Sequence, residues 1–187
     1  MRKANFNDKT VVISILAEAF DRNPSVNYVV KQDAYRRDRI RRLMEYAFDV
    51  CHAFGDVLIS TDEQACALIL LPDKKRTSLR AWWWDVKLAL SVVGLSRVSA
   101  VLKRENQIKQ FHPKYPICYL WFIGVRNASR GKGIGSALMG EVIRAYDGRP
   151  IYLETSVKEN IPWYAKFCFE TFHTIDLTYT LFMMKRN

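Results

Sequence analysis

The sequence predicts an α/β domain built on a mixed β-sheet. Its 187 residues are enough for one hydrophobic core and too few for two ordinary domains. Apolar periodicity indicates helices first, then a hairpin, and then strand, helix, strand, helix and two closing strands, an order typical of α/β domains. The most informative stretch is 121–139, where an apolar strand runs through a turn with three glycines directly into a helix.

The first part of the chain predicts a short strand, two helices and a hairpin. Asp8 is expected to cap the first helix, and Pro24 marks its end. The second helix begins among the five arginines of 36–42, keeps apolar residues at helical spacing and stops at Gly55. Two β-rich runs around a polar turn then predict the hairpin. The expected bounds are 2–4 for the strand, 9–20 for the first helix, and 57–61 and 65–71 for the hairpin strands.

Residues 73–112 predict a helical insertion. Trp82, Trp83 and Trp84 open its first helix, and apolar residues go most of the way round that helix, so it must bury more than one face. Gly94 ends the first helix and a second one follows it. The longest uncharged run, 88–96, is far shorter than the roughly 20 apolar residues of a membrane span.

The last part of the chain, from residue 117 onward, alternates strands with helices. The helix after the glycine turn has Ile134, Leu138 and Val142 on one face, and Asp147 with Gly148 stops it. Pro162 suits the first turn of a second, short helix. The expected strands are 117–125, 151–155, 172–175 and 178–184, and the expected helices are 133–146 and 160–167.

The glycine turn has the features of an anion cradle. Gly131, Gly133 and Gly135 allow conformations that other residues avoid, so consecutive amides can converge on a phosphate. The following helix adds the positive end of its dipole, and Arg130 and Lys132 add full charges. The sequence therefore predicts a phosphate-binding site at this turn.

Two common nucleotide-binding loops do not fit the spacing of this turn. A Walker loop ends in Gly-Lys-Ser or Gly-Lys-Thr, whereas Lys132 precedes the last two glycines. A dinucleotide fingerprint needs Gly-x-Gly-x-x-Gly, and here Ser136 stands in the last place. Both alternatives therefore fail.

The motif Arg130-x-x-Gly133-x-Gly135, after a strand that ends Ile-Gly-Val, resembles the pyrophosphate turn of the GCN5-related N-acetyltransferase (GNAT) superfamily. The strand 152–156 and the segment 160–169 resemble that family's second strand and its Asn-x-x-x-Tyr-x-Lys-x-Gly-Phe ending. The resemblance covers 115–185 well, 1–72 loosely and 73–112 hardly at all. It implies one domain over 1–187, with a central mixed, mostly antiparallel sheet flanked by helices and a helical insertion at about 73–112.

The resemblance also implies how acetyl-CoA would be bound. The strand ending at Val125 is expected to splay from the strand that begins at Ile151, so that pantetheine bonds to backbone between them and the Val125 amide serves the oxyanion. Asn160 would touch the cofactor or, alternatively, only cap its helix. The expected cofactor-binding residues are Ile123, Val125, Arg130, Gly131, Lys132, Gly133, Ile134, Gly135, Ser136 and Asn160.

Two catalytic residues follow from the same comparison and from the chemistry of amine acetylation. Tyr164 matches the tyrosine that protonates the departing thiolate in many relatives, although it could instead be a core aromatic. Glu154 is the candidate general base, since alternation puts it on the same strand face as Tyr152, or it is a carboxylate satisfied by its neighbours. His112, just before the central strand, is the weaker alternative for the base.

These residues predict an acetyl-CoA-dependent N-acetyltransferase in which a primary amine attacks directly, without a covalent acetyl-enzyme. Cys118 and Cys168 lack a neighbouring histidine in sequence, so a cysteine nucleophile is disfavoured. The alternatives are a catalytically inactive CoA-binding sensor and a basic nucleic-acid adaptor. The insertion has three interpretations, namely a wall or lid of the acceptor site, which we adopt as the working hypothesis, a homodimer contact, and a helix that lies on a membrane surface.

Partners and location follow from charge and composition. The net charge of +10 favours anionic ligands, but the arginine-rich helix is expected to be a solvated basic face and not a nucleic-acid groove. The four cysteines and three histidines lack zinc-site spacing, so no metal is expected. The N-terminus lacks the apolar stretch of a secretion signal, which favours the cytoplasm. The acceptor is a small-molecule or peptide amine, and polyamines are disfavoured because no cluster of acidic residues is evident.

Overall fold

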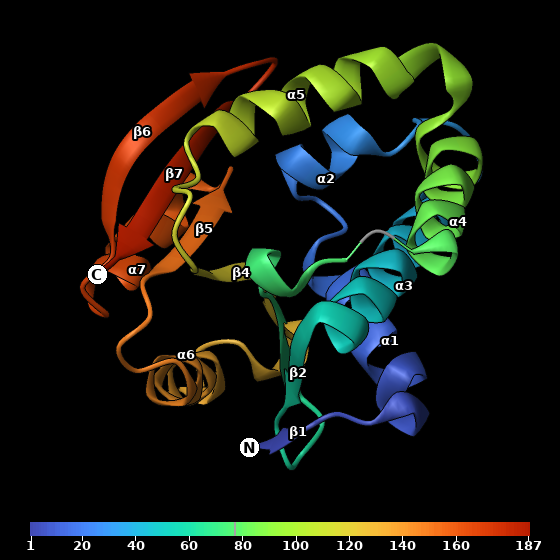
Figure 1. The fold of residues 1–187 in the computed structure, drawn as a ribbon. Helices are drawn as coiled ribbons and strands as arrows, with labels where there is room; N and C mark the ends of the chain where they lie inside the picture. Colours follow the sequence, from blue (N-terminus) through green and yellow to red (C-terminus); the bar gives the residue numbers. More distant parts are fainter. Residues whose placement is uncertain (77) are drawn as a thin grey trace.

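The computed structural model describes residues 1–76 and 78–187, except for the side chain of residue 80. Within this part of the chain, seven strands form one sheet in the order β1-β2-β3-β4-β5-β7-β6, with helices on both faces (Figure 1). Only β4 and β5 pair in parallel, so the prediction of a mixed, mostly antiparallel sheet is confirmed. The strands are β1 (Arg2–Lys3), β2 (Gly55–Ile59), β3 (Ala65–Leu70), β4 (Cys118–Val125), β5 (Ile151–Thr155), β6 (Glu170–Asp176) and β7 (Thr180–Arg186).

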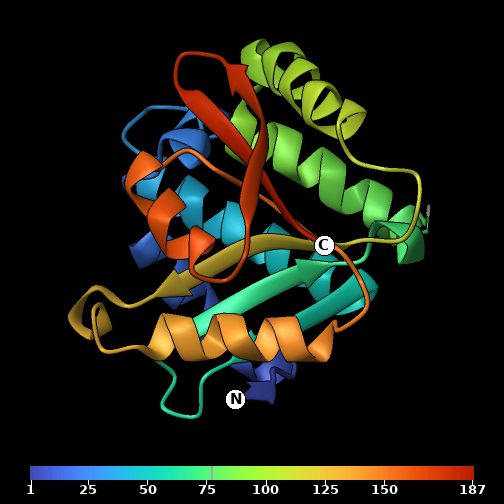
Figure 2. The ribbon, with the colours of Figure 1, turned by 90° about the vertical axis from the view of Figure 1, so that its left-hand side faces the viewer.

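The helices divide between the two faces of the sheet. α1 and α3 cover one face, while α6 lies across the other (Figures 1 and 2). The π-helical segment Ala89–Val93 continues α4 toward the turn that leads to α5. The helices are α1 (Lys9–Ala19), α2 (Pro24–Val29), α3 (Arg36–Phe54), α4 (Leu79–Leu88), α5 (Val98–Gln110), α6 (Ile134–Ala145) and α7 (Ile161–Ala165).

The core has one apolar cluster on each face of the sheet. On the α1–α3 side, Leu16 and Phe48 are fully buried, as the helical spacing of α3 predicts. On the α6 side, Leu138 and Val142 are fully buried, which confirms the apolar face expected for the helix after the glycine turn. The glycine turn is therefore attached to a helix whose position is fixed by burial.

Two local predictions near the N-terminus are wrong. Pro24 begins a separate helix, α2, because proline lacks an N–H and its fixed φ suits the first helical position. Asn23 caps that helix by accepting a hydrogen bond from the Val26 amide at 3.0 Å. Asp8 makes no side-chain cap bond to α1, since its carboxylate accepts from Arg2 Nη1 at 2.6 Å and from the Asn5 amide at 2.8 Å.

The insertion packs through both of its helices. Val92 and Val93, which follow α4, are buried in the α1–α3 cluster, and Ile108 of α5 packs on the β6–β7 hairpin. Arg97 donates to the Tyr28 carbonyl at 2.6 Å, which ties the α4–α5 turn to α2. Among the described helices, none combines the length and the apolar character needed to cross a membrane.

Candidate active site

The parallel pair β4–β5 opens into a gap. The two strands pair only at Cys118 with Ile151 and at Tyr119 with Tyr152, after which no register pair joins them. On its other side, β4 stays paired with β3 as far as Val125. The expected splay between these strands is thus present, and it leaves one backbone edge of β4 without a strand partner.

Backbone alternation identifies the amides that face this gap. The Arg126 amide donates to the Gln64 carbonyl at 2.8 Å, so the backbone polar groups of Arg126 point toward β3. Successive residues of a strand point their polar groups to opposite sides. The N–H and C=O groups of Val125 and Ile123 therefore point into the gap, where the sequence analysis expects the pantetheine arm.

The glycines of the turn are required by backbone conformation and close packing. Gly131 and Gly133 have φ values of +78° and +79°, which residues with a side chain rarely adopt. A Cβ atom on Gly135 would lie 3.2 Å from Cγ2 of Val125, so that position is restricted by contact with the end of β4. These constraints bring the start of α6 against the last residue of β4.

The N-terminus of α6 presents free amides. The first intrahelical bond runs from the Ala137 amide to the Gly133 carbonyl at 2.9 Å, so the amides of Ile134, Gly135 and Ser136 lack an intrahelical partner. The Ser136 hydroxyl accepts from Trp163 Nε1 at 3.1 Å, which ties the turn to α7 and leaves the Ser136 amide available. Such a helix terminus suits a phosphate.

The two candidate bases lie side by side. Glu154 Oε1 is 3.0 Å from His112 Nε2, and Glu154 Oε2 accepts from the Tyr119 hydroxyl at 2.5 Å. The Glu154 side chain is 7% exposed and that of His112 is 16% exposed. Burial and the neighbouring Glu154 charge raise the pKa of Tyr119 well above 10, so this hydroxyl stays a donor. Both oxygens of Glu154 are thus occupied by partners that hold it in place.

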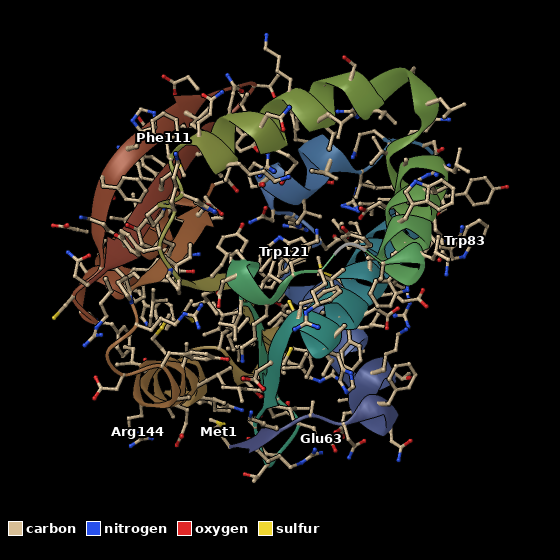
Figure 3. The ribbon with its side chains drawn as sticks, viewed as in Figure 1. Met1, Glu63, Trp83, Phe111, Trp121 and Arg144 are labelled. Atoms are coloured by element: carbon tan, nitrogen blue, oxygen red, sulfur yellow. The ribbon has the colours of Figure 1, made fainter. Side chains whose placement is uncertain are left out.

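Aromatic side chains form a wall next to this cluster. The Tyr119 ring stacks at 6.3 Å from Trp121, and Tyr46 of α3 meets Trp121 edge-on at 5.9 Å. Figure 3 shows Trp121 between the sheet and the helical layer. We call Tyr46, Tyr119 and Trp121 the aromatic wall. It combines flat apolar surface with hydroxyl groups at its ends.

Comparison with known proteins decides the family. The model of the acetyltransferase (GNAT) family matches residues 77–169. The chain belongs to the GNAT superfamily. Its fold is the one found in GNAT acetyltransferases of known structure, as the resemblance of the glycine turn and of the 160–169 segment implies.

Three solved structures show the likeness in fold. Histone acetyltransferase HPA2 and related acetyltransferase from Corynebacterium glutamicum is 21% identical, with 98% of this chain and 93% of that chain covered, at a TM-score of 0.74. The C-terminal condensation domain of Ebony is 10% identical, with 99% and 96% covered, at 0.72. Arylalkylamine N-acetyltransferase 2 from Aedes aegypti is 16% identical, with 99% and 96% covered, at 0.66.

Asn160 lies at the start of α7 and Tyr164 near its end, with the Tyr164 ring in the apolar cluster on the α6 side of the sheet. The Tyr164 ring is buried against Trp163 and Phe169, and burial raises the pKa of its hydroxyl well above 10. Asn160 occupies the cap position of α7, but its exposed side chain makes no cap bond. The side-chain amide of Asn160 is therefore not used to cap α7. The contact of Asn160 with the cofactor stays a prediction.

The charged residues of the turn do not converge on it. Arg130 is exposed and donates to the Ala19 carbonyl of α1 at 3.3 Å. Arg126 lies 3.3 Å from the Glu18 carboxylate, also on α1. Lys132 is exposed at the tip of the turn. The backbone amides are therefore the part of the cradle that the fold holds in place, while the roles of Arg130 and Lys132 toward phosphate stay predictions.

Cys118 and Cys168 differ in exposure and backbone conformation. Cys118 is buried, and burial raises the pKa of its thiol to about 12, which keeps it protonated near neutral pH. Cys168 is exposed and has a φ of +61°, the left-handed conformation for which the family uses glycine. Within the described residues, no group of three or more His, Cys, Asp or Glu side chains is placed to hold a metal ion.

Two acidic residues that no sequence pattern marked lie near the aromatic wall. Asp85 of α4 accepts a hydrogen bond from the Tyr46 hydroxyl at 2.7 Å. Glu105 of α5 forms an ion pair with Arg104. Burial is the largest cause of the raised pKa values of Tyr46 and Tyr119, their closer carboxylates Asp85 and Glu154 come next, and the charge of Glu105 adds a smaller contribution. Both acids belong to the insertion, where the resemblance to the family is weakest, and only the packing of α4 and α5 brings them here.

Proposed function

We propose that the protein is an acetyl-CoA-dependent N-acetyltransferase in which a primary amine attacks directly within a ternary complex. The observation that carries the proposal is the open edge of β4. It connects the free amides of the glycine turn, at one end of the strand, with the His112–Glu154–Tyr119 cluster at the other. A phosphate-bearing thioester donor and an amine acceptor can therefore approach the same strand from opposite ends.

The residues present fit acetyl-CoA, which would supply an activated acetyl thioester. The amides at the start of α6 would hold its pyrophosphate, and the backbone groups of Ile123 and Val125 in the gap would bond its pantetheine arm. An amide of β4 that points into the gap, that of Ile123 or of Val125, is a preorganised donor for the oxyanion that forms at the carbonyl, and one such donor is worth about 3–4 kcal/mol of barrier.

His112 and Glu154 act in this proposal as one base. An ionised Glu154 can only accept, so it holds the proton of His112 on Nε2 and leaves a lone pair on Nδ1. The imidazole then removes the proton of the attacking amine, while Glu154 orients the ring and Tyr119 orients Glu154. Glu154 thus becomes the residue that positions the base.

Tyr164 would assist the leaving thiolate. Burial keeps its hydroxyl protonated, which a donor requires, but a phenol with a raised pKa is a weaker acid than a thiol of ordinary pKa near 8.5. The phenol therefore stabilises the thiolate by a hydrogen bond more than by complete proton transfer. Its loss should slow the reaction without abolishing it.

The aromatic wall supports an arylalkylamine as the acceptor. The rings of Tyr119 and Trp121 offer a flat apolar surface directly beside the proposed base. The Aedes aegypti protein of similar fold is named an arylalkylamine N-acetyltransferase, and the Ebony domain was solved with beta-alanyl-dopamine, which agrees with this class.

A thioester-release assay tests the proposal. CoA formation is followed with acetyl-CoA and a panel of 2-phenylethylamine, tryptamine, butylamine, spermidine and a short peptide. Turnover of the arylalkylamines, with KM below that of butylamine, is expected. Trp121→Leu should raise the KM of the arylalkylamines about ten-fold and leave that of butylamine nearly unchanged.

Three results would contradict the proposal, each in a different way. Tight binding of acetyl-CoA in calorimetry without turnover of any amine would favour an inactive sensor. Salt-sensitive binding of a random DNA duplex without acetyl-CoA binding would favour a nucleic-acid adaptor. Turnover of butylamine and phenylethylamine with equal KM would refute the aromatic acceptor while leaving N-acetyl transfer in place.

A further inference from the structure

The outer face of α4 exposes a row of large apolar side chains. Leu79 is 89% exposed, Trp82 and Trp83 are each 61% exposed, and Leu90 is 57% exposed. Helical spacing places these four residues on one face, whereas Ala81 on the opposite face is buried. Figure 3 shows Trp83 on the side of α4 that points away from the sheet. We call these four residues the α4 ridge, and a continuous patch of this kind marks an interaction site.

Basic side chains flank the α4 ridge. α3 runs beside α4, since Arg39 donates to the Ser91 carbonyl at 2.6 Å and Tyr46 to Asp85 at 2.7 Å. The exposed face of α3 therefore adjoins the ridge on one side, and the segment before α4 adjoins its start. The cationic rim consists of Arg42, which lies on α3 next to its α4-facing residues, and of Lys74, Lys75 and Arg76 before α4. Within the described chain, none of these four residues lies within ion-pair distance of a carboxylate.

Acidic residues on the same surface do not offset this rim. Glu45 is paired with Lys9 at 3.3 Å and lies 3.9 Å from Lys87. Asp85, whose partner is the neutral Tyr46 hydroxyl, and the exposed Asp38 of α3 keep their negative charges, but they are fewer than the four cations of the rim. The surface around the α4 ridge therefore has an excess of positive charge, in a chain whose net charge is +10.

We propose that the α4 ridge and the cationic rim dock the protein onto an anionic lipid surface. Tryptophan is favoured where headgroups meet acyl chains, and leucine beside it would enter the apolar layer. Lysine and arginine around such a face attract anionic headgroups. The ridge spans 12 residues of α4 and its π-helical continuation, which is about 18 Å at 1.5 Å per residue and long enough for a helix that lies flat on a membrane.

Charge complementarity selects lipid over the other occupants of this face. In a two-fold dimer the same patch meets itself, so the excess positive charge around one ridge would face that around the other. A nucleic acid would need cations in the middle of the contact, where Leu79, Trp82, Trp83 and Leu90 stand instead. A surface with fixed negative charge and an apolar layer beneath it matches both parts of the patch.

The arrangement leaves the proposed cofactor site free. α6 and the glycine turn lie on the opposite side of the sheet from α4 (Figure 1). Docking through α4 would therefore bring the acceptor side toward the lipid and keep the turn in water. This inference is independent of the chemistry proposed for the site, because it concerns only the outer face of the insertion.

Co-sedimentation with vesicles tests the inference on the full chain. Vesicles of phosphatidylcholine alone are compared with vesicles that also contain phosphatidylglycerol, at low and high salt. We expect binding to the anionic vesicles that weakens with salt, and little binding to the neutral ones. Arg42→Gln with Lys75→Gln should weaken binding roughly five-fold per cation removed. Trp82→Ala with Trp83→Ala should weaken it at least about ten-fold.

A matched variant controls for net charge. Arg144→Gln with Lys158→Gln removes two exposed cations away from α4 and should bind almost as the wild type does. Equal loss in this control and in the rim variant would overturn the inference, and so would no binding of the wild type to anionic vesicles. A third result would assign this face to a second copy of the chain. In it, the wild type does not bind lipid and sediments as a dimer, and Trp82→Ala with Trp83→Ala converts the dimer to a monomer.

Discussion

Replacing Glu154 by glutamine tests whether this carboxylate positions the catalytic base or only stabilises the fold. Glutamine keeps the shape of the buried side chain and can still accept from Tyr119, but it loses the charge that holds the His112 proton on Nε2. A hydrogen bond to a charged group is worth about 1.5–3 kcal/mol, and 2.7 kcal/mol corresponds to about 100-fold in rate. Glu154→Gln should therefore lower kcat about 100-fold while the Kd of acetyl-CoA stays within about two-fold, because the substitution leaves the turn untouched.

The decisive comparison is with His112→Gln and with the double variant. If the two residues form one base, His112→Gln also loses about 100-fold, and the double variant loses about the same, not the product of the two. Steady-state CoA release with the best amine of the panel gives these values, and Glu141→Gln on the outside of α6 is the control of equal charge change.

Two outcomes would refute the reasoning. A double variant that loses about 10,000-fold would show that His112 and Glu154 act independently. A Glu154→Gln variant with unchanged kcat and pH profile but a lower unfolding temperature would assign the pair to stability alone.

Four other changes test separate parts of the structure. Gly133→Ala, at φ +79°, should weaken acetyl-CoA binding about ten-fold in calorimetry, whereas Gly140→Ala inside α6 should not. Tyr164→Phe should lower kcat about three- to ten-fold with little change in the KM of acetyl-CoA, and unaltered turnover would leave Tyr164 a core aromatic. Cys168→Gly should stabilise the fold by about 1 kcal/mol in chemical denaturation, because it relieves a φ of +61°. The Arg2 hydrogen bonds lower the pKa of Asp8 to about 2, so this carboxylate stabilises the fold above pH 4 and the gain disappears as pH falls toward 2. Asp8→Asn should then cost roughly 1 kcal/mol at pH 7 and nothing at pH 2, whereas an equal loss at both pH values would contradict the ion pair.

The order of elements and most of their bounds could be predicted from the sequence. The strand 151–155, the stop of the arginine-rich helix before Gly55 and the apolar face of α6 follow from local patterns, and the structure confirms them. The helix α2 is not among the predicted elements, because Pro24 is taken as the end of the first helix and not as a first helical position. A proline indicates a helix boundary, but it does not indicate whether the helix lies before or after that residue.

The pairing of His112 with Glu154 could not be predicted from either residue. They are 42 positions apart, and each was a separate candidate for the base. Their contact depends on the short register of β4 with β5, which puts Tyr119 opposite Tyr152 and so brings the loop before β4 against β5. Strand register is a property of the folded sheet and leaves no mark in the local sequence.

The sequence by itself predicted the proposed donor side of the site, and only the tertiary structure brought together the residues of the proposed acceptor side. Gly131, Gly133 and Gly135 are required by conformations and contacts that a side chain would prevent, so residue type alone reveals the cradle. Tyr46 of the aromatic wall and the acids Asp85 and Glu105 come from helices whose spacing is compatible with several packings. Which packing forms depends on which face of α4 is buried. The sequence does not indicate that face, because the helix is apolar nearly all round.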